Sequence, residues 1–101
     1  MDATTDAGRR REQVLRAFFD GEGRLTSIPA KHAKRLVVLD RLAQLFEPGE
    51  RYPETEVNRR LRGAHDDVAA LRRYLVDEGF LSREGGVYWR TGGTVTESPE
   101  D

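Results

Sequence analysis

Basic side chains gather at the start of a predicted helix, in the stretch SIPAKHAKRLVVL of residues 27–39. Lys31, Lys34 and Arg35 share one face of that helix, because positions three and four apart are neighbours on a helix surface. His32 lies slightly round from them. The unpaired N–H groups of a helix N-terminus already carry partial positive charge, so each cation there costs about 0.3–1 kcal/mol unless an anion is close. The chemistry that this pattern predicts is the binding of an anion or a phosphate group.

Two explanations of this cluster remain open from the sequence. Asp20 and Glu22, or Asp66 and Asp67, would neutralise the cations if they folded back onto the helix start. Otherwise an anionic partner from outside the chain docks there, with the backbone N–H groups as additional donors. The first explanation makes the cluster structural, and the second makes it a binding site.

A second basic surface is expected on the two helices that follow, over about residues 53–62 and 66–78. Its predicted members are Arg59, Arg62, Arg72, Arg73 and the aromatic Trp89, with Arg83 and Arg90 flanking the predicted hairpin. Basic side chains interleaved with aromatic rings suit nucleic acid, because bases stack on the rings while the cations contact phosphates. The alternative is a solvated surface in which Tyr88 or Trp89 covers the core, since side chains alternate between the two faces of a strand.

The outer face of the predicted helix 66–78 argues against direct reading of DNA bases by that helix. Its charged residues there are Asp66, Arg73 and Asp77, which give a net charge of −1. Asp67 adds a second carboxylate at the helix start, where a recognition helix would approach the DNA backbone and base edges. Successive carboxylates repel phosphates, so we expect contact with DNA through another face of the domain.

Residue types suited to catalysis are scarce. The two histidines, His32 and His65, are far apart in the sequence, and no group of His, Asp and Glu has the spacing of metal ligands. No serine lies in the context of an activated nucleophile, and no glycine-rich turn has the pattern of a phosphate-binding loop. The chain has no cysteine. We therefore expect no enzymatic activity, no cofactor and no metal site.

The charge of the 101-residue chain is distributed unevenly. All 17 Lys and Arg residues and 13 of the 18 acidic residues lie in residues 9–90, which gives that segment a net charge of +4. Arginine supplies 15 of the 17 cations, which favours bidentate contacts with carboxylate or phosphate groups. No apolar run approaches the roughly 20 residues of a membrane span, and no signal-peptide pattern begins the chain. We expect a cytoplasmic protein without membrane contact.

Apolar periodicity predicts four helices followed by a β-hairpin with Gly85 and Gly86 in its tight turn. The expected helices cover about residues 9–20, 30–46, 53–62 and 66–78. The predicted fold is α+β and mainly helical: a winged-helix-like three-helix core with a C-terminal β-hairpin and an extra N-terminal helix. The predicted organisation is a disordered N-terminus over 1–8, the domain over 9–90, and a disordered acidic C-terminal tail over 91–101.

Three stretches of the sequence together resemble a bacterial family known only as domain of unknown function 2087. They are GRLTSIPAKHAKRL, FEPGERYPETEVN and LRRYLVDEGFLSREGGVYWR, and the likeness covers about residues 13–90. Members of that family resemble winged helices and occur alone or fused to DNA-binding domains of the arsenic-repressor type. The resemblance implies a link to transcriptional regulation, although the family has no established activity. Pro53 departs from the family pattern, in which Ser or Thr is commoner as a helix cap.

The adjacent Phe18 and Phe19 cannot both lie on one narrow helical stripe, so we expect a homodimer through the N-terminal helix. The expected function is a non-catalytic module in bacterial transcriptional regulation that binds DNA through the basic surfaces of the second and third helices. The alternative is a protein-interaction or small-anion-sensing module on the same scaffold, without DNA binding. The outer face of helix 66–78 separates the two, because a DNA reader needs that face to be basic.

Overall fold

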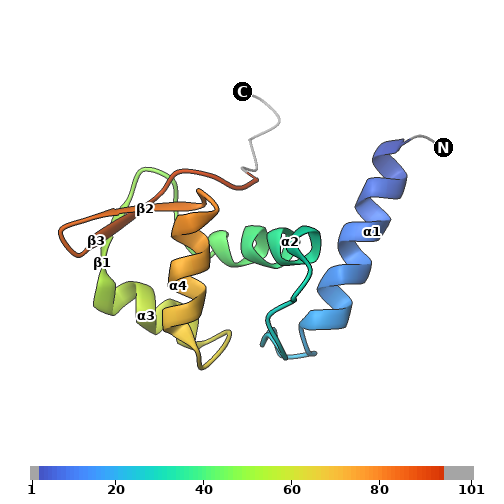
Figure 1. The fold of residues 1–101 in the computed structure, drawn as a ribbon, viewed down its shortest axis with the longest axis horizontal. Coiled ribbons are helices and arrows are strands. Elements are labelled where there is room, and N and C mark those ends of the chain that lie inside the picture. The colour runs from blue at the N-terminus through green and yellow to red at the C-terminus, as the bar shows by residue number, and fades with distance from the viewer. Residues whose placement is uncertain (1–2, 95–101) are drawn as a thin grey trace.

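The computed structural model of the chain describes residues 3–94, with side chains from residue 8 onward. It contains four helices and a three-stranded antiparallel sheet (Figure 1). In chain order the elements are α1 (Ala3–Phe18), α2 (His32–Ala43), β1 (Arg51–Pro53), α3 (Glu54–Arg62), α4 (Val68–Asp77), β2 (Leu81–Glu84) and β3 (Val87–Arg90). This is the mainly helical α+β fold that the sequence predicts, with a three-helix core, a C-terminal hairpin and an extra N-terminal helix.

The hydrophobic core lies where α2, α3 and α4 meet under one face of the sheet. The helices contribute their apolar positions at helical spacing, and these side chains are at most 2% exposed: Val38, Leu39 and Leu42 from α2, Val57 and Leu61 from α3, and Leu71 and Leu75 from α4. The helix α2 contacts both α1 and α4. It is therefore the central helix, as its broad apolar face predicts.

The helix α1 lies at one side of the molecule, beside α2 and away from the sheet (Figure 1). It begins at Ala3, so it extends into the segment 1–8 that the sequence predicts to be disordered. Phe18 and Phe19 are both partly buried against the core, because α1 ends at Phe18 and Phe19 forms a β-bridge with Leu25. Neither ring requires a second chain to cover it, and a homodimer through α1 stays a prediction.

The strand β1 was not expected, because the sequence pattern predicts only a loop between α2 and α3. Arg51–Pro53 instead forms an edge strand, and the sheet order is β1–β3–β2. Three residues are too few for a visible alternation, and the pairing that creates this strand comes from β3, far along the chain. A proline is acceptable here, since an edge strand can leave one backbone donor unused.

Alternation along β3 decides which aromatic residue of the hairpin enters the core. Tyr88 points inward and is 1% exposed. Trp89 therefore lies on the opposite face of the sheet, where the guanidinium carbon of Arg51 stands 4.5 Å from its ring centroid. The structure thus selects Tyr88 as the residue that covers the core, and it separates Trp89 from the helices.

A buried carboxylate joins α1, α2 and the chain after β3. Asp40 of α2 is 6% exposed, and its Oδ2 lies 2.7 Å from Nη2 of Arg11 in α1. Its two oxygens also accept from Thr94, from the backbone N–H at 2.6 Å and from the hydroxyl at 2.9 Å. Gly93 has φ +93° and lies against Asp40, where a Cβ would stand 2.9 Å from Oδ1. The packed chain therefore continues past residue 90 to residue 94, and residues 95–101 of the predicted tail lie outside the described residues.

The protonation of Asp40 follows from these contacts. Burial raises the pKa of the carboxyl, but the hydrogen bonds from Thr94 and the charge of Arg11 outweigh it, so the pKa lies below its ordinary value of 3.8. A carboxyl whose pKa is lowered by folding stabilises the fold fully above its unfolded-state pKa. That stabilisation is lost as the pH falls through the lower, folded-state pKa.

Replacement of Asp40 by Asn should lower the free energy of unfolding at pH 7 by about 1–3 kcal/mol, because a charged hydrogen-bond acceptor is lost. Urea denaturation measures this loss, and the difference from wild type should shrink below about pH 4. The matched control is Glu12→Gln, since the Glu12 side chain is 71% exposed, and it should change stability by less than about 0.5 kcal/mol. Equal losses for the two variants would contradict the role assigned to Asp40.

Candidate nucleic-acid interface

Arg35, the innermost cation of the α2 cluster, is engaged within the molecule. Its guanidinium carbon stands 4.7 Å from the ring centroid of Tyr74 on α4. Its Nη1 donates to the backbone carbonyls of Pro29 at 3.2 Å and Ala30 at 3.0 Å. These contacts fasten the start of α2 to α4, because one side chain joins both. Arg35 is therefore a structural residue.

The other members of the cluster divide into one paired and two free side chains. Nε2 of His32 lies 3.1 Å from both carboxylate oxygens of Glu78. Within residues 8–94, neither Lys31 nor Lys34 forms an ion pair or a side-chain hydrogen bond. Both are exposed, so the free positive charge at this helix start is that of two lysines.

Three of the four carboxylates that were expected to neutralise the cluster, Asp20, Asp66 and Asp67, have other partners. Asp20 accepts from the backbone N–H groups of Glu22 at 2.8 Å and Arg24 at 2.9 Å. These backbone hydrogen bonds lower the pKa of Asp20 below its ordinary value. Asp66 lies 3.1 Å from Nη2 of Arg24. Asp67 accepts from the N–H of Ala70 at 3.2 Å and so caps α4.

Two of the three arginines of α3 are paired with a glutamate of the same helix. Glu56 accepts from Arg59 at 2.9 and 2.6 Å and from Arg60 at 2.7 Å. These side-chain hydrogen bonds, Arg59 first, lower the pKa of Glu56 to about 2. The guanidinium of Arg60 also stacks 4.7 Å from the ring centroid of Tyr52. Of the residues predicted on this helix, Arg59 is held by Glu56, whereas Arg62 is exposed.

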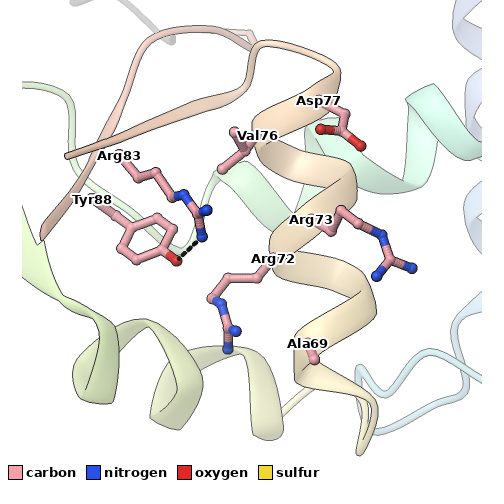
Figure 2. Close-up of a pocket in the computed structure, with 7 residues that line it drawn as sticks. All are labelled: Ala69, Arg72, Arg73, Val76, Asp77, Arg83 and Tyr88. Carbon is pink, nitrogen blue, oxygen red and sulfur yellow. Dashed lines mark hydrogen bonds between the residues drawn. The ribbon is translucent and has the colours of Figure 1, made fainter. Parts of the chain in front are cut away.

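A hollow of about 290 Å³ lies between the exposed face of α4 and the β2–β3 hairpin (Figure 2). Three arginines line it, Arg72 and Arg73 from α4 and Arg83 from β2, against one lining carboxylate, Asp77. In Figure 2, Arg72 and Arg83 lie on the hairpin side of α4, and Arg73 and Asp77 lie on its other side. The hollow is therefore the site where the structure concentrates arginine side chains from separate elements.

The sequence of α4 explains the shape of this surface. Ala69, Arg72, Arg73 and Val76 recur at the spacing of one broad helical face, and all four line the hollow. Arg72 and Arg73 stand at the two edges of that face (Figure 2). Ala69 is small, so it leaves the N-terminal half of the helix open to close approach. Leu71 and Leu75 hold the opposite face in the core.

A buried hydroxyl positions the arginine of the hairpin. The Tyr88 hydroxyl donates to Oε1 of Glu54 at 2.8 Å and accepts a long hydrogen bond of 3.4 Å from Nη1 of Arg83 (Figure 2). Arg72 donates to Oδ1 of Asn58 at 2.5 Å, and its Nε lies 3.9 Å from Glu54. Both guanidinium groups are thus held at the edge of the core.

The structure brings together only part of the residue set that the sequence predicts. Arg72 and Arg73 meet at the hollow, whereas Trp89 lies on the other face of the sheet. From the sequence, Arg83 is expected only to flank the hairpin beside this surface and is not among the predicted site residues. Arg83 is the cross-strand partner of Tyr88, so it shares the core-side face of the sheet, and the identity of the inward aromatic residue would have been the signal.

Comparison with known proteins places the chain in a family. The chain belongs to the family described as "Uncharacterized protein conserved in bacteria (DUF2087)", whose model matches residues 24–90. No curated protein and no solved structure shows significant similarity to it.

Two further features of the described residues bear on the class of site. No helix within them has the length and apolar composition that a membrane crossing needs. In the same part of the chain, His, Asp and Glu side chains form no group suited to hold a metal ion. The charged groups that line the hollow are three arginines and Asp77.

The two roles found in the α2 cluster predict different effects of the same kind of substitution. Arg35→Met should lower the free energy of unfolding by about 1–2 kcal/mol, because the stacking on Tyr74 and two hydrogen bonds to carbonyls are lost. Lys34→Met should change it by less than about 0.5 kcal/mol. Urea denaturation of both variants measures the difference. A larger loss for Lys34 than for Arg35 would show that the division is wrong.

Proposed function

We propose that this domain is a non-catalytic winged-helix module of bacterial gene regulation that binds nucleic acid through the face shared by α4 and the β2–β3 hairpin. The observation that carries the proposal is the hollow between these elements, with Arg72, Arg73 and Arg83 around it. Guanidinium groups suit phosphates, since their planar fork donates two parallel hydrogen bonds. A helix beside such cations is the element that helix–turn–helix modules place against DNA.

The proposal moves the main contact surface from the one expected from sequence, on α2 and α3, to α4, whose carboxylates argue against base reading. The contact proposed here is to phosphates, through Arg72, Arg73 and Arg83. Arg35, His32 and Arg59 are occupied by partners within the chain, which leaves fewer free cations on those helices. Lys31 and Lys34 are exposed and unpaired within residues 8–94. They supply a second, weaker contribution through long-range attraction of phosphates.

A second candidate is a sensor of a small phosphorylated molecule that does not bind DNA. The size of the hollow favours it, because about 290 Å³ is close to the lower end of the range of small-ligand sites, roughly 300–1,000 Å³. Exposed carboxylates just before α4 and at its end, Asp66 and Asp77, also weaken the attraction of a long polyanion.

Fluorescence anisotropy with labelled random duplex DNA tests the main proposal. The affinity of the wild-type protein should fall about tenfold between 50 and 200 mM salt for two neutralised phosphates, and more for each further one. The double variant Arg73→Glu/Arg83→Glu should lose most of this binding and most of the salt dependence. The matched double variant Lys31→Glu/Lys34→Glu should weaken binding less.

Thermal unfolding of both double variants checks that they remain folded. No binding of wild-type protein at 50 mM salt would overturn the proposal of nucleic-acid binding. A larger loss from the lysine variant would instead return the contact surface to α2, as the sequence predicts. A loss of equal size from Arg9→Glu/Arg16→Glu on α1 would mean that only net charge is measured.

A further inference from the structure

We infer that the hairpin side of the hollow, between the guanidinium groups of Arg72 and Arg83, is a binding site for a single phosphate group. The site would accept the phosphate of a nucleic-acid backbone or of a phosphorylated small molecule. This inference deepens the proposed function and rests on it only for the choice between these two sources. The two arginines come from different elements, α4 and β2, and lie on the same side of the helix in Figure 2. Each guanidinium can donate to a phosphate oxygen, so a phosphate seated between the two side chains would be held from both elements.

The charges of the two arginines are incompletely neutralised. Arg83 forms no ion pair within residues 8–94, and its one polar contact is to the uncharged hydroxyl of Tyr88. Arg72 has only a distant carboxylate, Glu54, at 3.9 Å. Arg72, Arg73 and Arg83 together with Asp77 and Glu54 give the hollow a net charge of +1, which an oxyanion would balance.

The site is arranged before any ligand arrives. The Arg72 side chain is 20% exposed and is fixed by its hydrogen bond to Asn58. Arg83 is held by a hydroxyl whose ring is 1% exposed. Binding to restrained side chains costs less conformational entropy than binding to free ones. This restraint separates the pair from Lys31 and Lys34, whose side chains have no such supports within residues 8–94.

The other residues that line the hollow indicate which further groups of a ligand it would accommodate. Ala69 and Val76 provide an apolar floor beside the arginines, which suits the sugar or carbon skeleton attached to a phosphate ester. Asp77 lines the opposite side and repels an anion. Replacement of Asp77 should therefore tighten phosphate binding, whereas loss of an arginine should weaken it.

Nuclear magnetic resonance of the full chain, titrated with inorganic phosphate at constant ionic strength, tests the site directly. Saturable shifts are expected at the side-chain Nε–H of Arg72 and Arg83 and at the backbone of Ala69. Arg83→Gln should weaken this binding about tenfold or more, because a charge-assisted contact is lost. Asp77→Asn should tighten it about twofold to fivefold. The matched control Arg16→Gln, whose side chain is 83% exposed on α1, should leave it unchanged.

Duplex DNA and a sugar phosphate, titrated separately, distinguish the sources. Shifts at the same signals with DNA support the site as a contact for backbone phosphate. Shifts with the sugar phosphate but no DNA binding support the site and overturn the proposed nucleic-acid function. The inference is wrong if phosphate gives no saturable shift at Arg72 and Arg83, or if Arg83→Gln and Arg16→Gln weaken binding equally. If the phosphate site fails this test but DNA still binds, the proposed nucleic-acid function holds and only the phosphate site is rejected.

Discussion

The ring and hydroxyl of Tyr88 connect the sheet, the helices and the candidate site. The ring is among the largest fully buried side chains, so it fixes the hairpin over the three-helix core through hydrophobic burial. A buried tyrosine hydroxyl needs a partner, and here it donates to Glu54 at the start of α3. The same oxygen accepts from Arg83, so packing of the core also sets the position of a cation at the edge of the hollow.

A second buried polar group, Asp40, connects elements on the α1 side of the molecule, as Tyr88 connects them at the hairpin. It joins α1 through Arg11 and the end of the described chain through Thr94. A buried carboxylate is tolerated only when it is well paired, and these contacts supply that pairing. Asp40 thus joins α1 to the segment that follows β3, and Tyr88 positions the surface that we propose binds phosphate.

The sequence allowed the strongly periodic elements to be predicted, and the family match over residues 24–90 confirms the resemblance. Four helices and a hairpin follow from local apolar spacing and glycine stops. The strand β1 does not, because its pairing with β3 is a long-range contact. Long-range contacts also decide which basic residues are free to bind a ligand. Nothing in the sequence shows that Arg35 contacts Tyr74 and two backbone carbonyls. Arg83 becomes part of a site only once Tyr88 is known to point inward.

The central claim is that nucleic acid meets the protein on the face of α4 and the hairpin. Photo-crosslinking of the full chain to halogen-substituted duplex DNA, with the attached peptides identified by mass spectrometry, tests this placement most directly. The account predicts that crosslinks concentrate in residues 69–77 and 82–88. Crosslinks confined to the start of α2 around Lys31 and Lys34, or to α3, would contradict it.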